Sequence, residues 1–218
     1  MNNREIKVLL DQKRRANGRV YNGDIKQIGK ELGRENCDLS NVQLGLDYEI
    51  DFVYFHIFLT RYRKDLNKQL KCIEPYLPYL DSWFKVDNLI TYFKKPINFD
   101  FFYSFAKIYL SSTNPYVQRL GYVGFIKADL KNIDNCIRII QLFKNTEEHT
   151  LIMAQAWVMA EMYINNPSLM YSFFKTSNLN YPIISMALSK CTDSYRISKD
   201  EKIKIRKLRP ILKMKKGG

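Results

Sequence analysis

The side chains most often used in catalysis and metal binding are few and scattered in this 218-residue chain. His56 and His149, the only two histidines, have no potential ligand at helical spacing, so neither a metal site nor a Ser-His-Asp triad is predicted. The four cysteines lie too far apart for a CxxC pair, and we expect them to be reduced core residues. No glycine-rich phosphate loop occurs. Carboxylates, tyrosines, lysines and arginines are left to carry any chemistry, without metal or cofactor.

Trp83 and Asp87 form one such candidate pair. They are four residues apart and would project from the same face of a helix. The face of an indole and a carboxylate both attract positive charge, so the pair suits a cationic ligand or intermediate. The structural alternative is a core tryptophan beside a solvated or capping carboxylate.

Positive charge accumulates toward the C-terminus. The chain has 35 Lys and Arg against 22 Asp and Glu, a formal net charge of +13. Residues 190–218 alone hold eleven basic and three acidic side chains. This excess favours a polyanionic partner such as nucleic acid or an anionic membrane surface, although a solvated basic tail has the same composition.

The elements that must position these residues are predicted to be helices. Apolar residues recur at three- and four-residue spacing along nearly the whole chain, which indicates about a dozen amphipathic helices. Helix-start residues separate them, as at Asp47, Ser82, Asn114-Pro115 and Ser198 with Glu201. Segments opening near residues 47, 81, 114, 147 and 179 recur at roughly 35 residues, the length of a two-helix hairpin. The pattern predicts an all-α solenoid, with a compact non-repeating bundle as the alternative.

Four motifs then occur in a characteristic order. They are W-x-x-x-D at 83–87, S-x-N-x-x-x-x-R at 112–119, M-A-x-A-W at 153–157 and S-Y-R-I-S at 194–198, the last followed by a basic helix. In this order the chain resembles the bacterial DNA alkylation repair family, the AlkD-type HEAT-like-repeat alkylpurine DNA glycosylases. The resemblance covers residues 47–208. It departs from the family at Gln118, where many members have a second arginine, and at Tyr116, where tryptophan is frequent.

The resemblance implies a right-handed superhelix of about six HEAT-like two-helix repeats. Residues 1–209 would form this single domain, with residues 1–46 as a poorly matched N-terminal repeat. Residues 210–218 would be a basic C-terminal tail.

The resemblance also implies site residues. Asp87 resembles the catalytic carboxylate of the family, and Trp83 and Trp157 resemble its two cleft aromatics. Together with the charge pattern it predicts the following DNA-binding residues: Tyr116, Arg119, Arg196, Lys199, Lys202 and Arg206. For the basic helix that follows residue 198, a solvated face is the alternative.

The implied activity is hydrolysis of the N-glycosidic bond of cationic alkylated purines, such as 3-methyladenine and 7-methylguanine, in duplex DNA. We expect a monofunctional glycosylase, because no lysine has a recognisable Schiff-base role. One alternative is a non-catalytic binder of damaged or branched DNA, and another is a HEAT-type protein-interaction scaffold.

The chain offers no membrane signal. Its longest apolar stretch, residues 52–59, is too short to span a bilayer, and residues 1–5 lack the apolar core of a signal peptide. We expect a cytoplasmic, nucleoid-associated monomer that does not use a membrane.

Overall fold

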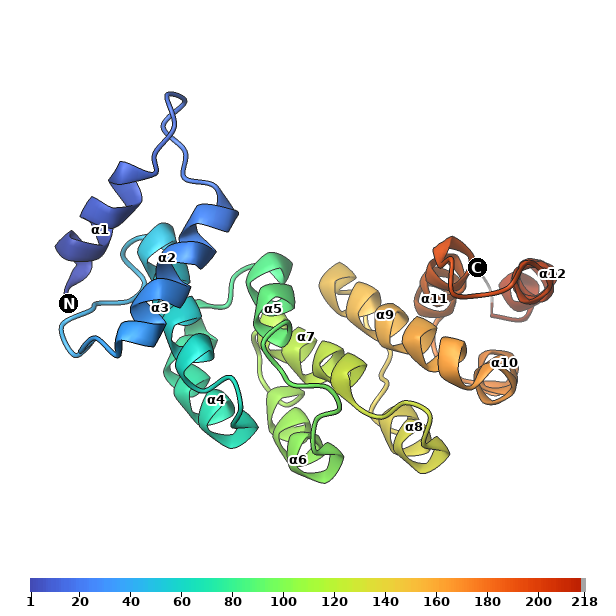
Figure 1. The fold of residues 1–218 in the computed structure, drawn as a ribbon. Coiled ribbons are helices and arrows are strands. Elements are labelled where there is room, and N and C mark those ends of the chain that lie inside the picture. The colour runs from blue at the N-terminus through green and yellow to red at the C-terminus, as the bar shows by residue number, and fades with distance from the viewer. Residues whose placement is uncertain (217–218) are drawn as a thin grey trace. The chain divides into compact units, whose positions relative to one another are not determined.

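The computed structural model describes residues 1–216, which contain twelve α-helices, two 3₁₀-helices and no β-strand (Figure 1). The helices are α1 (Asn3–Gln12), α2 (Asn22–Glu35), α3 (Tyr48–Arg61), α4 (Leu66–Ile73), η1 (Glu74–Tyr79), α5 (Trp83–Ile90), α6 (Phe99–Tyr109), α7 (Pro115–Val123), η2 (Gly124–Lys127), α8 (Ile133–Ile140), α9 (His149–Asn165), α10 (Pro167–Thr176), α11 (Tyr181–Asp193) and α12 (Lys199–Lys216). The predicted all-α fold is confirmed.

The predicted helix starts are also confirmed. Asp47, Ser82 and Asn114 are the N-cap residues of α3, α5 and α7, and each side chain accepts a hydrogen bond from a backbone N–H of the first turn. The Ser198 hydroxyl accepts from Glu201 N at the start of α12. The five predicted repeat openings each precede a helix by one or two residues. These starts are encoded locally, because the cap and the N–H groups that it satisfies lie within one turn.

The chain divides into two compact units, residues 1–94 and the residues from 95 onward. Unit 1 contains α1 to α5 with η1, and unit 2 contains α6 to α12 with η2. The first unit therefore includes the N-terminal segment 1–46 that matched the expected pattern poorly.

Unit 1 is built around close packing of α2 on α3. Gly29 and Gly33 permit it: a Cβ on Gly29 would lie 2.8 Å from Val53 O, and one on Gly33 would lie 2.9 Å from Ile57 O. Such approaches exclude any larger residue unless the helices separate. The helix pair therefore depends on two glycines on one face of α2.

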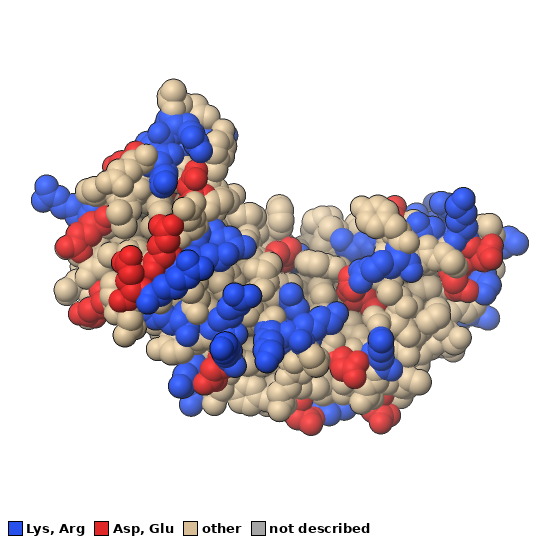
Figure 2. Space-filling view, in the orientation of Figure 1, with Lys and Arg blue, Asp and Glu red and all other residues tan. Residues whose placement is uncertain are grey.

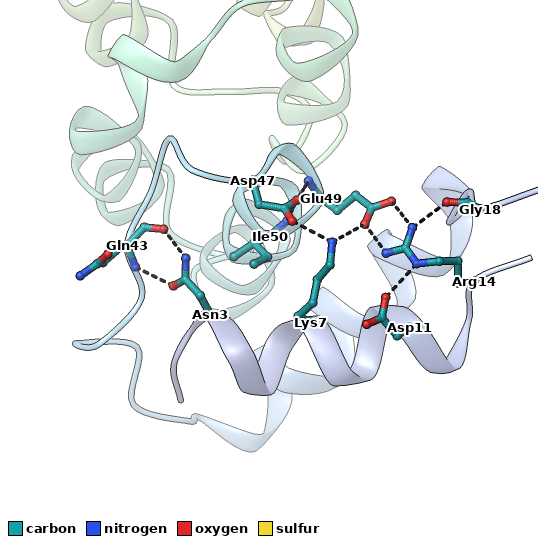
Figure 3. A network of polar contacts seen from close by, with 9 residues as sticks. All are labelled: Asn3, Lys7, Asp11, Arg14, Gly18, Gln43, Asp47, Glu49 and Ile50. Carbon is teal, nitrogen blue, oxygen red and sulfur yellow. Dashed lines mark hydrogen bonds and ion pairs between the residues drawn. The ribbon is translucent and has the colours of Figure 1, made fainter.

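An ion-pair network joins α1 to the start of α3 (Figure 3). Lys7 Nζ lies 2.8 Å from Asp47 Oδ2 and 3.3 Å from Glu49 Oε2, and Arg14 Nη2 lies 2.7 Å from Glu49 Oε2. The hydrogen bonds from Arg14 and then Lys7 hold the pKa of the Glu49 carboxyl below its ordinary value of 4.5. The network attaches the N-terminal helix to the rest of unit 1.

Unit 2 alternates two sets of helices (Figure 1). α7 packs on α9 and α9 on α11, while α6, α10 and α12 pack against α7, α9 and α11 respectively. Stacked two-helix hairpins produce this arrangement. The handedness of a superhelix and the number of six repeats stay predictions.

The predicted C-terminal tail is largely helical. α12 continues through Pro210 to Lys216, and Leu212 within it is 1% exposed. The expected boundary after residue 209 therefore falls inside a packed helix, because its apolar face covers part of unit 2. Gly217 and Gly218, the end of the predicted tail, lie outside the described residues. Among residues 1–216, no helix is both long enough and apolar enough to cross a bilayer.

Candidate active site

Trp83 and Asp87 both lie on α5, in unit 1. Trp83 is the first residue of the helix and is 59% exposed, with its ring edge-on to Phe84 at 6.1 Å between centroids. Asp87 follows one turn later and is half-buried. Val86, Leu89 and Ile90 are buried, so they hold α5 on the core while its first residue is open to solvent. The core alternative for Trp83 is therefore wrong.

Lys85 anchors the start of α5. This side chain is almost entirely buried, and its ammonium donates to Tyr79 O at 3.0 Å and to Asp81 Oδ2 at 2.9 Å. It also lies 5.0 Å from the ring centre of Tyr48. Three internal partners fix the lysine, so it positions the helix that carries Trp83 and Asp87. The sequence analysis did not identify it, because the i, i+4 spacing from Asp81 is equally typical of an exposed ion pair.

Tyr116 and Arg119 lie on α7 in unit 2. Tyr116 is half-buried in the first turn, where its backbone N–H donates to Asn114 Oδ1 at 2.8 Å. Arg119 is only 5% exposed, and its Nη1 donates to Thr150 O in the first turn of α9 at 3.2 Å. The guanidinium therefore helps to hold α7 on α9, and DNA contact by this arginine stays a prediction.

Trp157 lies in the middle of α9, in unit 2. Its neighbours Ala156 and Val158 are fully buried, whereas Trp157 itself is half-buried. A helix that is apolar on most sides normally belongs to a core. The side chain is nevertheless accessible in part, which a cleft aromatic requires.

The basic residues near the C-terminus fall into two groups. Arg196 forms a two-pronged ion pair with Glu161, at 3.0 and 2.5 Å, while Lys204 pairs with Glu201 at 2.5 Å. Lys199 and Arg206 are exposed and Lys202 is half-buried. None of these three has a carboxylate partner among the described residues. They remain available for an external anion.

The buried histidine serves the core. His56 is fully buried, and its Nδ1 lies 2.7 Å from the Tyr92 hydroxyl. Burial, reinforced by the positive charges of Lys26 and Lys30, lowers the pKa of His56 to about 3. The ring is therefore neutral at physiological pH. Within residues 1–216, no three His, Cys, Asp or Glu side chains cluster as metal ligands would.

Comparison with known proteins now decides the family. A sequence model of the family described as DNA alkylation repair enzyme matches residues 20–190, most of the chain. The chain belongs to this family. Membership in the DNA alkylation repair enzyme family confirms the resemblance found in the motifs and gives the protein a role in the repair of alkylation damage, with DNA as its substrate. No curated protein and no solved structure matches the chain.

The family match includes five of the predicted site residues. They are Trp83, Asp87, Tyr116, Arg119 and Trp157. Arg196 and the basic residues of α12 lie beyond residue 190. Their expected contacts with DNA therefore depend on charge and exposure within this repair protein, independently of the family match.

Proposed function

We propose that the protein is a monofunctional DNA glycosylase that hydrolyses the N-glycosidic bond of cationic alkylated purines in duplex DNA. The observation that carries this proposal is α5, where an exposed tryptophan precedes a half-buried carboxylate by one turn within the family match. The substrate would be of the 3-methyladenine and 7-methylguanine type. No cofactor enters the proposed reaction.

Asp87 would act by electrostatics. Alkylation leaves the purine cationic, so its bond to the sugar is already weak and the base departs without strong acid catalysis. The sugar then acquires oxocarbenium character, which a carboxylate facing the anomeric carbon stabilises. The same carboxylate can orient the water that attacks.

Trp83 and Trp157 would form apolar walls beside the lesion. An indole face attracts a cation, and excluding water strengthens the attraction between Asp87 and the developing positive charge. The exposure of Trp83 supports this role directly, and the partial exposure of Trp157 is compatible with it. In this mechanism the protein holds the lesion mainly through its backbone.

The DNA backbone would be held by the predicted basic residues. Lys199, Lys202 and Arg206 support the proposal best, because no carboxylate within residues 1–216 neutralises them. Arg119 and Arg196 already bind protein acceptors, and each would add a phosphate to those contacts, since a guanidinium has five donors. Tyr116 would lie beside them at the start of α7.

The experiment is incubation of the purified protein with methylated duplex DNA, followed by chromatographic identification of released bases. We expect release of 3-methyladenine and 7-methylguanine with accumulation of abasic sites. Duplex binding without base release would replace the proposal by a non-catalytic binder of damaged or branched DNA. Absence of both binding and release would favour a protein-interaction scaffold.

A further inference from the structure

Unit 1 contains a second basic site, which shares no residue with the predicted active site. It is an open pocket of about 500 Å³ with no carboxylate among its lining residues. We call it the α2–α3 basic pocket, and its six cationic side chains are Lys26, Lys30 and Arg34 of α2 with Arg61, Arg63 and Lys64 at the end of α3. Figure 2 shows Lys and Arg side chains gathered on the face of unit 1 that carries α2.

The α2 cations form a row along one face of the helix. Lys26, Lys30 and Arg34 are spaced four residues apart, so like charges lie on successive turns. Such pairs destabilise a helix. Burial, followed by the charge of Lys30, lowers the pKa of Lys26. The row opposes the stability of α2, and this cost calls for a compensating role.

Internal contacts neutralise little of this charge. The guanidinium of Arg61 donates to the carbonyl of Cys37, and Lys26 lies 5.6 Å from the ring centre of Tyr92. Neither partner is a carboxylate. The other four cations have no carboxylate partner within residues 1–216, and Arg34, Arg63 and Lys64 are exposed. The pocket therefore presents uncompensated positive charge to solvent.

The end of a helix explains only part of the cluster. Basic residues in a last turn stabilise the negative end of the helix dipole, which suits Arg34 in α2 and Arg61 in α3. Lys26 and Lys30 lie in the first and middle turns of α2, where the dipole gives them no such advantage. Tyr92, which carries the buried contact with His56, lines the pocket beside them.

We infer that the α2–α3 basic pocket binds closely spaced phosphate groups. From Lys26 to Arg34 the row extends about 12 Å at 1.5 Å per residue, longer than a single phosphate needs. Arginine can hold phosphate oxygens in pairs and lysine acts as a point charge. The matching ligand is a chain of phosphates, either the backbone of a nucleic acid or a free polyphosphate group. Phosphate binding here does not require that the protein remove bases.

The test compares two variants of the full chain. The pocket variant is Lys30→Gln with Arg34→Gln, and the control is Arg4→Gln with Lys13→Gln, which also removes one exposed arginine and one lysine from unit 1 but lies outside the pocket. Binding of sodium tripolyphosphate is measured by calorimetry. Binding of an undamaged DNA duplex is measured by fluorescence anisotropy over a range of salt concentrations.

We expect the pocket variant to lose affinity for at least one probe relative to the control. Loss for the duplex, with a slope of log affinity against log salt that is smaller by about 1.8, assigns the phosphates to DNA. Loss for tripolyphosphate alone assigns them to a small polyphosphate ligand. Equal binding of both probes by the two variants would overturn the inference.

A measurement on the unmodified chain guards against misfolding of the variants. A saturating concentration of whichever probe binds should slow chemical acetylation of Lys26 and Lys30, but not of Lys13, as followed by mass spectrometry. Equal acetylation with and without the probe would also overturn the inference. Base release is not a readout in either experiment, so failure of the glycosylase proposal would be seen separately.

Discussion

Trp83 and Asp87 owe their positions to two neighbours outside their motif. Ser82 caps the helix at Lys85 N, and the buried Lys85 ammonium binds back to Tyr79 and Asp81. Together they fix where α5 begins, and therefore which residue is left exposed in its first turn. At this scale the candidate site is an anchored helix start.

Asp87→Asn tests the catalytic carboxylate. Removing one preorganised charged group should lower the single-turnover rate of 7-methylguanine excision by on the order of a hundred- to a thousandfold. Duplex affinity should be kept or slightly raised, because a negative charge near the DNA is removed. Asp134→Asn, an exposed carboxylate in the first turn of α8, is the matched control and should excise normally. A near-normal rate in Asp87→Asn would remove Asp87 from the mechanism.

Trp157→Ala separates a cleft role from a packing role. Because the side chain is half-buried, truncation should cost about 1–2 kcal/mol, less than the roughly 3–5 kcal/mol for a fully buried tryptophan. Excision per folded molecule should fall substantially. Thermal unfolding beside a single-turnover assay decides the matter. A large loss of melting temperature with normal excision would make Trp157 a packing residue only.

α12 shows how one helix divides its charges between structure and a partner. Ile205, Leu208 and Leu212 are buried against unit 2. Lys204 is paired with Glu201, and Arg209 donates to Ser189 Oγ at 2.7 Å. Lys199, Lys202 and Arg206 have no carboxylate partner in the described part of the chain. The phase of the helix thus selects which cations remain for DNA.

Charge reversal on α12 tests that selection. Lys202→Glu with Arg206→Glu should weaken duplex binding and reduce the slope of log affinity against log salt by about 1.8 or more, since each lost phosphate contact releases fewer counterions. Anisotropy titrations at several salt concentrations measure the slope. Arg4→Glu with Lys13→Glu is the control of equal charge. If both double variants have the same slope, α12 faces away from DNA.

The attachment of α1 should depend on pH. The Glu49 carboxyl has a lowered pKa in the folded chain, so its contribution to stability is complete above 4.5 and is lost as pH falls through the folded pKa. Glu49→Gln should therefore lower the melting temperature by roughly 1–3 °C at pH 7, and the difference from the unmodified chain should shrink below pH 4.5. Glu35→Gln is an exposed control in α2. A difference that is constant with pH would contradict the ion-pair assignment.

Across the whole molecule, positive charge is presented by separate elements of the two units. The α2–α3 basic pocket belongs to unit 1, and the unpaired cations of α12 belong to unit 2. Because these groups share no partner, their effects on binding should be independent. The net charge of +13 is thus displayed at more than one surface.

Combining the two sets of substitutions tests whether one duplex uses both surfaces. A chain carrying Lys30→Gln and Arg34→Gln together with Lys202→Glu and Arg206→Glu should lose as much log affinity as the two double variants combined. The salt slopes should add in the same way. If the combined variant binds no more weakly than one double variant, only one of the two surfaces contacts DNA.

Much of this protein is determined by its sequence alone. Helical periodicity and the caps at Asp47, Ser82 and Asn114 predicted the all-α fold and the places where helices begin. The ordered motifs predicted the repair family. Both kinds of signal are local, because a cap acts within one turn and a motif within one helix.

Only the tertiary structure decided burial and partnership. It buried Arg119, paired Arg196 with Glu161, and left Trp83 exposed while Trp157 became half-buried. It also brought the row on α2 next to the cations at the end of α3. A charged residue looks the same in sequence whether it stabilises a neighbouring helix or remains unpaired. The difference depends on which distant segment packs beside it, and that is fixed only when the helices assemble.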